Sequence, residues 1–86
     1  MEFEGSVIKE QGTTFGIIVV KEDVLRSTSE ASKWRQLGFR AFGNIPIILM
    51  AQDYSGVPTY QGRQDIVRFL ANISFTRIPW KKYTLN

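Results

Sequence analysis

The segment Asn44–Asp53, NIPIILMAQD, constrains the fold more than any other stretch, because it holds the densest apolar run in the chain. Large aliphatic side chains fill Ile45–Met50, and only Pro46 interrupts them. Gly43 precedes the run and the turn residues Tyr54–Gly56 follow it. A short apolar run between turn residues is typical of a strand that is covered on both faces. The sequence therefore predicts a buried central strand here.

A hairpin is predicted before this strand. Phe3–Glu10 mixes apolar and polar side chains in imperfect alternation, whereas Thr14–Val20 is β-branched and apolar on both faces. Gln11–Thr13 lies between them and is expected to turn the chain. We therefore expect two paired strands, the second of them central in the sheet. Gly16 within the second strand indicates a bulge or a close backbone approach.

A helix should follow the hairpin. Ser27–Glu30 has the capping-box pattern, in which a hydroxyl and a carboxylate satisfy free amide donors at a helix start. Apolar residues then recur at spacings of three and four on one narrow face, namely Ala31, Trp34, Leu37 and Ala41. The helix either ends early at Gly38 or frays through Phe39–Gly43. With the strands on either side, it completes a β-α-β unit.

Three further segments follow the central strand. Asp53 and Gly56 hold the first and fourth positions preferred in a type I turn. Val57–Gln61 is expected to be a short edge strand, because Pro58 cannot donate a ladder hydrogen bond. Gly62–Asp65 then begins a second helix with Asp65 and Arg68 spaced for an ion pair. Its apolar stripe is Ile66, Phe69, Leu70 and Ile73.

These patterns predict an α+β fold in a single domain that spans residues 1–86. The expected order is β-β-α-β-β-α, with a mixed sheet of about four strands and two helices packed on it. Residues 74–86 form an aromatic and basic C-terminal tail, which should pack on the body because so much apolar area rarely stays in water. Strand order, the face that each helix covers, and the oligomeric state stay open.

Residues 39–73 resemble the C-terminal half of the thioredoxin fold. The resemblance rests on the order of a loop, Ile45-Pro46, an apolar strand, the turn Asp53–Gly56, an edge strand, Gly62 and a helix containing Phe69-Leu70. In that family a proline, usually after a cis peptide bond, precedes the matching hairpin, and Pro46 stands in its place; the sequence leaves open whether this bond is cis. The chain lacks the Cys-x-x-Cys motif. The resemblance therefore implies a cysteine-free relative that acts as a binding module, without redox activity.

The chain contains neither histidine nor cysteine. This excludes disulfides, the usual transition-metal ligands, and the Ser-His and Cys-His nucleophile pairs. An enzyme would have to use Asp, Glu, Lys or Tyr, and the candidate carboxylates are Asp53 with Glu22 or Asp23, which are expected near neighbouring strand ends. Acids at such positions most often cap turns or solvate the surface. We therefore expect no enzymatic activity, no cofactor and no bound metal.

Charge is distributed unevenly along the chain. The net charge is +3, with a balance of −3 over residues 1–23 and +6 over residues 24–86. Such asymmetry fits an ordinary solvated surface and also fits an anionic partner. The acidic start, MEFEGSVIKE, lacks the apolar core of a signal peptide, and no run approaches the roughly 20 residues needed to span a bilayer. We expect a cytoplasmic protein that makes no membrane contact.

The basic, aromatic tail is the best candidate for a binding surface. Cations beside aromatic rings suit phosphates and stacked bases, although Trp80 in particular is also a natural anchor for the tail. The candidate residues are Arg63, Arg68, Arg77, Trp80, Lys81, Lys82 and Tyr83. We expect a small non-catalytic module for protein–protein interaction, which presents an edge strand or a helix face to an unidentified partner. The alternative is nucleic-acid binding through these residues.

Overall fold

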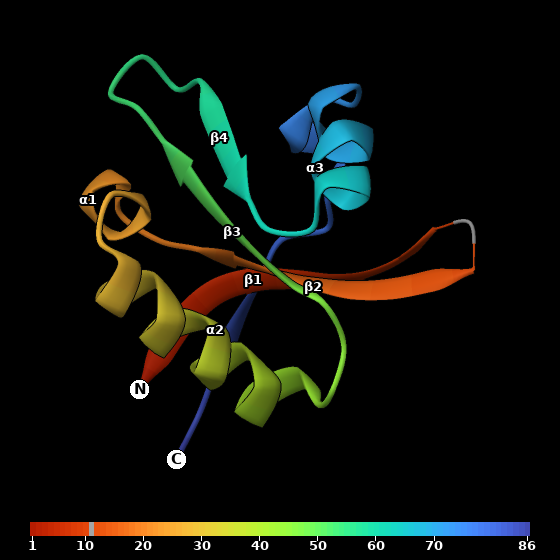
Figure 1. The fold of residues 1–86 in the computed structure, drawn as a ribbon. Coiled ribbons are helices and arrows are strands. Elements are labelled where there is room, and N and C mark those ends of the chain that lie inside the picture. Colours follow the sequence, from red (N-terminus) through yellow and green to blue (C-terminus); the bar gives the residue numbers. More distant parts are fainter. Residues whose placement is uncertain (11) are drawn as a thin grey trace.

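The computed structural model describes residues 1–10 and 12–86, and its centre is a five-stranded mixed sheet (Figure 1). The strands lie in the order β4-β3-β2-β1-β5. Their bounds are β1 Glu2–Glu10, β2 Thr13–Val19, β3 Ile47–Gln52, β4 Pro58–Gln61 and β5 Lys81–Thr84. The helices are α1 Glu22–Leu25, α2 Thr28–Phe42 and α3 Gln64–Ala71, followed by a single 3-10 turn, η1 Phe75–Arg77. The fold class is α+β, as predicted.

β3 is the buried strand that the apolar run predicts. It pairs in parallel with β2 and antiparallel with β4, and five of its six residues are buried. The parallel pairing of β2 with β3 through α2 confirms the predicted β-α-β unit. The short strand β4 lies at the edge of the sheet with Pro58 in it, also as predicted. No peptide bond in residues 1–10 and 12–86 is cis, so the bond before Pro46 is trans.

The two long helices cover opposite faces of the sheet, and each encloses its own apolar core (Figure 1). Because side chains alternate along a strand, Ile47 and Leu49 of β3 face α2, whereas Ile48 and Met50 face α3. The core on the α2 face contains Phe3, Ile18, Val20, Ala31, Ile47, Leu49 and Ala51. The core on the α3 face contains Phe15, Ile17, Ile48, Met50, Ile66, Leu70 and Ile78.

Ser27 caps the start of α2, and Gly43 ends the helix. The hydroxyl of Ser27 accepts a hydrogen bond from the amide of Glu30 at 3.2 Å, which is one half of the predicted capping box. Gly38 does not end the helix: it is buried, and the methyl carbons of Ile47 and Ile18 fill the space that a side chain would need. The helix continues to Phe42, and Gly43 stops it with a φ of 90°, which favours glycine.

Two counts in the sequence-based prediction are wrong. The sheet has five strands rather than four, because part of the expected tail forms β5 and pairs with β1. Lys81–Thr84 has no apolar alternation, so its strand depends on backbone pairing with β1 and not on its own pattern. A third helix, the single turn α1, lies between β2 and α2. The predicted turn at Gln11–Thr13 includes Gln11, which lies outside the described residues.

Replacing Gly16 by alanine should lower the free energy of unfolding by about 1–3 kcal/mol, the usual cost of overpacking. A Cβ added at Gly16 would lie 2.6 Å from Cδ2 of Phe42, at the end of α2. Urea unfolding followed by tryptophan fluorescence measures the loss. Adding Phe42→Leu to the Gly16→Ala variant should cost less than Phe42→Leu costs alone, because the smaller side chain relieves the clash. Full stability of the single variant would contradict the close packing of α2 on β2.

Candidate functional site

The part of β1 that lies beyond β5 has an open backbone edge. The amides of Gly16 in β2 and of Val20, the residue after this strand, donate to the carbonyls of Pro46 and Met50 at 2.9 and 2.8 Å. The even-numbered residues of β2 therefore point their backbone groups toward β3. The odd-numbered residues of β2 must then point theirs toward β1. Their partners in β1 are even-numbered, for example Ile8 opposite Phe15.

The odd-numbered residues of β1 consequently point their N–H and C=O groups to the other side, where β5 lies. β5 uses these groups at Phe3 and Gly5, opposite Tyr83 and Lys81, and its pairing ends there. Val7 and Lys9 come next on the same side, with no strand opposite them in the described part of the chain. Their backbone donors and acceptors form an open edge.

Pro79 is the reason that β5 does not continue along β1. It has no N–H, and its carbonyl accepts a hydrogen bond from the hydroxyl of Ser6 at 3.1 Å. The chain before it turns toward α3, where Ile78 is buried in the core. The indole N–H of Trp80 donates to the carbonyl of Phe75 at 2.9 Å and closes this turn. The segment before β5 is thereby held away from the β1 edge.

A hollow of about 430 Å³ lies between this open edge and α3. Val7–Glu10 of β1 forms one side, and Phe69, Ile73 and the segment Arg77–Pro79 form the other. We call the open edge together with this hollow the edge groove. Ile8, Phe69 and Ile73 are half-buried apolar side chains that pack on the α3-face core, and Val7 is 42% exposed at the rim. The edge groove thus has an apolar floor and an unpaired strand as one wall.

The rim of the edge groove carries two cations and one acid. Lys9 and Arg77 are exposed there, and Glu10 is the acid among the lining residues. In residues 1–10 and 12–86 the ion pairs are Arg26 with Glu22 and Arg63 with Asp65. Neither Lys9 nor Arg77 therefore has a carboxylate partner in the described structure.

The outer edges of the sheet differ from the edge groove. On β4, Pro58 removes a backbone donor, and Tyr60 is the remaining residue of that strand whose N–H can point outward. On β5, the outward positions belong to Lys82 and Thr84, and lysine on an edge strand discourages pairing with another chain. Both outer edges carry features that proteins use against unwanted strand pairing, whereas the β1 segment at Val7 has an apolar, exposed residue.

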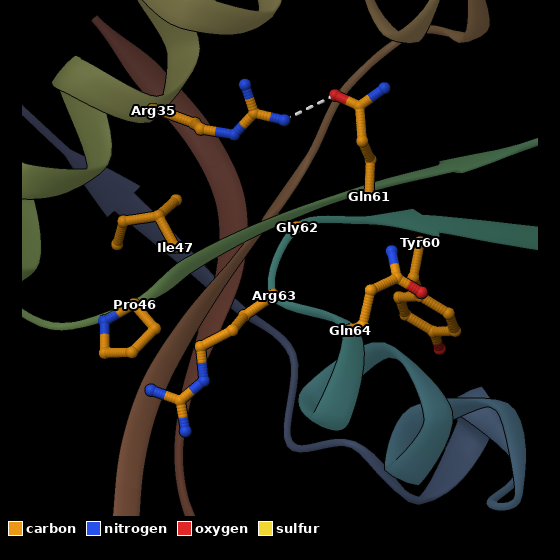
Figure 2. Close-up of a pocket in the computed structure, with 8 residues that line it drawn as sticks. All are labelled: Arg35, Pro46, Ile47, Tyr60, Gln61, Gly62, Arg63 and Gln64. Atoms are coloured by element: carbon orange, nitrogen blue, oxygen red, sulfur yellow. Dashed lines mark hydrogen bonds between the residues drawn. The ribbon is translucent and has the colours of Figure 1, made fainter.

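A second hollow, of about 610 Å³, lies where β4 leads into α3 (Figure 2). Arg35 of α2 donates to the side chain of Gln61 at 2.6 Å, and Gln61 in turn donates to the carbonyl of Leu25 at 3.0 Å. Figure 2 shows the guanidinium groups of Arg35 and Arg63 pointing away from each other. The two arginines do not converge on one ligand position, so this hollow is a weaker candidate.

Tyr60 lines the second hollow, and its hydroxyl is buried and lacks a hydrogen-bond partner within the described residues. Burial raises the pKa of this hydroxyl above its ordinary value. Figure 2 shows the ring lying toward α3, away from Arg35. Tyr60 therefore belongs to the packing of β4 on α3.

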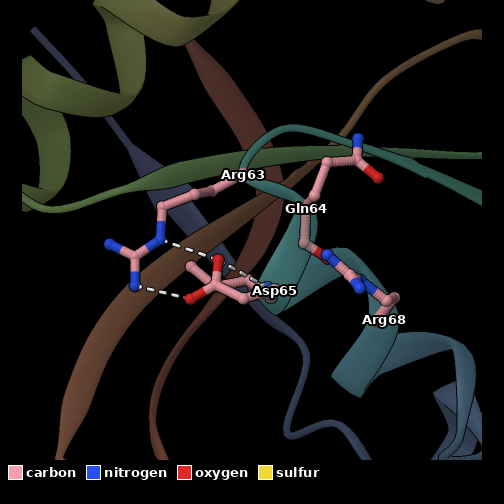
Figure 3. Close-up of polar contacts among 5 residues, drawn as sticks. Arg63, Gln64, Asp65 and Arg68 are labelled. Atoms are coloured by element: carbon pink, nitrogen blue, oxygen red, sulfur yellow. Dashed lines mark hydrogen bonds and ion pairs between the residues drawn. The ribbon is translucent and has the colours of Figure 1, made fainter.

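Arg63 and Asp65 form a fork-shaped ion pair at the start of α3 (Figure 3). Nε and Nη2 of Arg63 each lie 2.8 Å from a carboxylate oxygen of Asp65, and the amide of Ile66 donates to the same carboxylate at 3.0 Å. Hydrogen bonding to Arg63 holds the pKa of Asp65 at about 2. The expected pair of Asp65 with Arg68 is wrong: Arg68 donates instead to the carbonyl of Gln64 at 3.4 Å. Asp65 pairs with Arg63 because the guanidinium of Arg63 can donate to both carboxylate oxygens of Asp65 at once.

The seven residues that the sequence singles out do not form one surface. Tyr83 packs on the α2 face, stacked on Phe3 and edge-on to Phe42 with ring centroids 5.5 and 4.9 Å apart. Trp80 packs on the α3 face. Lys81 and Lys82 are consecutive strand residues and so point to opposite faces.

Of the seven, Arg77 alone lines the edge groove. The sequence reasoning missed Val7, Lys9 and Ile73 as site residues. The position of Val7 on an open edge depends on where β5 stops, and no local signal in β1 gives that. Ile73 is the last residue of the predicted apolar stripe and lies just after α3. The sequence pattern alone does not distinguish a residue that lines a hollow from one that is buried in the core.

The described residues hold no group of three or more acids placed to bind a metal ion. Within residues 1–10 and 12–86, no helix has both the length and the apolar character needed to cross a membrane. Comparisons with family models, with curated proteins and with solved structures gave no significant match to this chain. The resemblance of residues 39–73 to the thioredoxin fold accordingly stays a prediction.

Replacing Arg63 by glutamine should raise the pKa of Asp65 from about 2 toward its ordinary value of 3.8. A carboxyl whose pKa is lowered by folding stabilises the fold above its unfolded pKa, and this contribution is lost as the pH falls from about 4 to about 2. The variant should therefore lose less stability on acidification than the wild type. Carboxyl ¹³C chemical shifts measured against pH give both values. Arg68→Gln is the matched control and should leave the Asp65 titration unchanged; a wild-type midpoint near 3.8 would contradict the ion pair.

Proposed function

We propose that this protein is a small non-catalytic module that binds other proteins, and that the edge groove is its binding surface. The observation that carries the proposal is the apolar floor of Ile8, Phe69 and Ile73 beside an open strand and under a charged rim. Protein-binding sites commonly combine an apolar centre with a polar or charged border. The edge groove has this arrangement within a single small hollow.

The state of the candidate acid Asp53 favours binding over catalysis. Its Oδ1 accepts hydrogen bonds from the amide and hydroxyl of Ser55 at 2.9 and 2.6 Å and from the amide of Val57 at 3.0 Å. These donors, led by the Ser55 hydroxyl, lower the pKa of Asp53. A carboxylate held in this way stabilises the β3–β4 turn and is a poor proton acceptor for a substrate.

The state of the aromatic residues favours a protein partner over a nucleic acid. Tyr83 already packs against Phe3 and Phe42, and Trp80 packs on the α3-face core. Base stacking needs an accessible ring face. The two rings also lie on opposite faces of the sheet, and Arg63 is engaged with Asp65. Nucleic-acid binding through these residues would require them to leave partners that they already have.

The test uses peptides selected from a random phage-display library against the wild-type protein. In ¹⁵N–¹H NMR spectra, a bound peptide should shift the amides of Val7–Glu10, Phe69–Ile73 and Arg77–Ile78 more than those of α2. Ile73→Glu, which puts a charge in the apolar floor, should weaken binding by roughly tenfold or more. Val57→Glu is the matched control on a distant turn, where Val57 is 57% exposed, and should bind as the wild type does.

Two results would contradict the proposal. One is peptide-induced shifts that map to α2 or to the second hollow, with Ile73→Glu unaffected. The other is saturable, salt-sensitive binding of labelled single-stranded RNA that is lost in a Lys81→Glu, Lys82→Glu variant, because this would assign binding to the β5 surface.

A further inference from the structure

The edge groove has the features of a site for one more strand. We infer that an extended, acidic peptide segment of a partner protein binds there by adding to the β1 edge at Val7 and Lys9. The inference rests on the proposed function and goes beyond it, because it specifies both the mode of binding and the chemistry of the partner.

The backbone of β1 supplies the first argument. Val7 and Lys9 point their N–H and C=O groups to the same side, and they continue the row that Phe3 and Gly5 use to pair with β5. Two residues of a strand span about 6.6–6.8 Å, which is the spacing at which an added strand offers its own matching groups. An added peptide would therefore extend the line of β5 after the interruption at Pro79.

The apolar floor supplies the second argument. Side chains of an added strand alternate between the two faces of the sheet. Those on the α3 face would enter the hollow beside Ile8, Phe69 and Ile73, which are half-buried already. Those on the α2 face would lie next to Val7, whose side chain is exposed. Backbone hydrogen bonds combined with side-chain pockets are the usual basis of recognition by strand addition.

The charge at the rim supplies the third argument and selects the partner. Lys9 and Arg77 flank the groove without carboxylate partners in the described structure, and Glu10 lies at the end of β1, next to the hairpin turn. A peptide that alternates apolar and acidic residues, with its apolar side chains in the hollow, would place its carboxylates on the face of the sheet that Lys9 shares with Val7. A second copy of this chain would instead bring the same excess of positive charge to the interface, so a self-paired dimer through β1 is disfavoured.

The experiment uses a short fluorescein-labelled peptide of alternating valine and glutamate, titrated with the protein at low ionic strength and followed by anisotropy. The same peptide with lysine in place of glutamate should bind at least about tenfold more weakly. Val7→Pro removes an outward N–H that makes no bond within the sheet, so the protein should fold and yet bind the acidic peptide at least about tenfold more weakly. Thr84→Pro makes the matching change on the outer edge of β5 and should leave binding unchanged.

A second measurement leaves the protein unaltered. Two versions of the acidic peptide are methylated on alternate backbone nitrogens, one on the even-numbered and one on the odd-numbered residues. The version that loses the N–H groups facing the β1 carbonyls should not bind, and the version methylated on the outward-facing nitrogens should bind almost as the unmodified peptide does. Three results would each overturn the inference. These are equal binding of the two methylated peptides, binding of the lysine peptide as tight as that of the acidic one, and no binding of the acidic peptide. If phage-selected peptides still bind and remain sensitive to Ile73→Glu but not to Val7→Pro, the strand addition is wrong while the protein-binding function stands.

Discussion

The parallel pairing of β2 with β3 determines most of this structure. A strand with apolar side chains on both faces needs cover on both sides, and the crossover helix α2 covers one face while α3 covers the other. The pairing also sets the direction of every backbone group further along the sheet. Because the amides of Gly16 and Val20 point toward β3, the odd-numbered residues of β2 pair with the even-numbered residues of β1. The odd-numbered residues of β1 then point their backbone groups away from β2. A shift by one residue would turn the groups of Val7 and Lys9 inward, so the open edge depends on a contact two strands away.

The C-terminal segment both completes the sheet and limits it. β5 covers the first part of β1, and Pro79 prevents it from covering the rest. Trp80 and Tyr83 anchor the segment to opposite cores, which accounts for its aromatic content without a ligand. The residues that give the tail its appearance of a binding surface are thus largely structural, and the surface that they leave uncovered lies on β1.

Sequence patterns predict the elements of this fold that carry their own apolar signal. The run at Ile45–Met50, the stripe of α3 and the cap at Ser27 each specify an element locally, and each is found where expected. β5 could not be predicted, since Lys81–Thr84 becomes a strand only by pairing with the far end of the chain. The edge groove could not be predicted for the same reason. The groove begins where the pairing of β5 with β1 ends, after Gly5. The sequence around Val7 or Ile73 contains no pattern that indicates where this pairing ends.

The pairing of β1 with β5 joins the two ends of the chain. The amino group of Met1 donates to the carbonyl of Leu85, a contact between residues 84 positions apart, and the amide of Leu85 donates back to Met1. Contacts of such long range form late, because a large loop must close before they contribute. Until β5 docks, the whole outer side of β1 is unpaired. The order of folding steps therefore leaves a longer version of the same edge accessible to other chains, and the rate at which β5 docks limits how long refolding molecules can associate with one another.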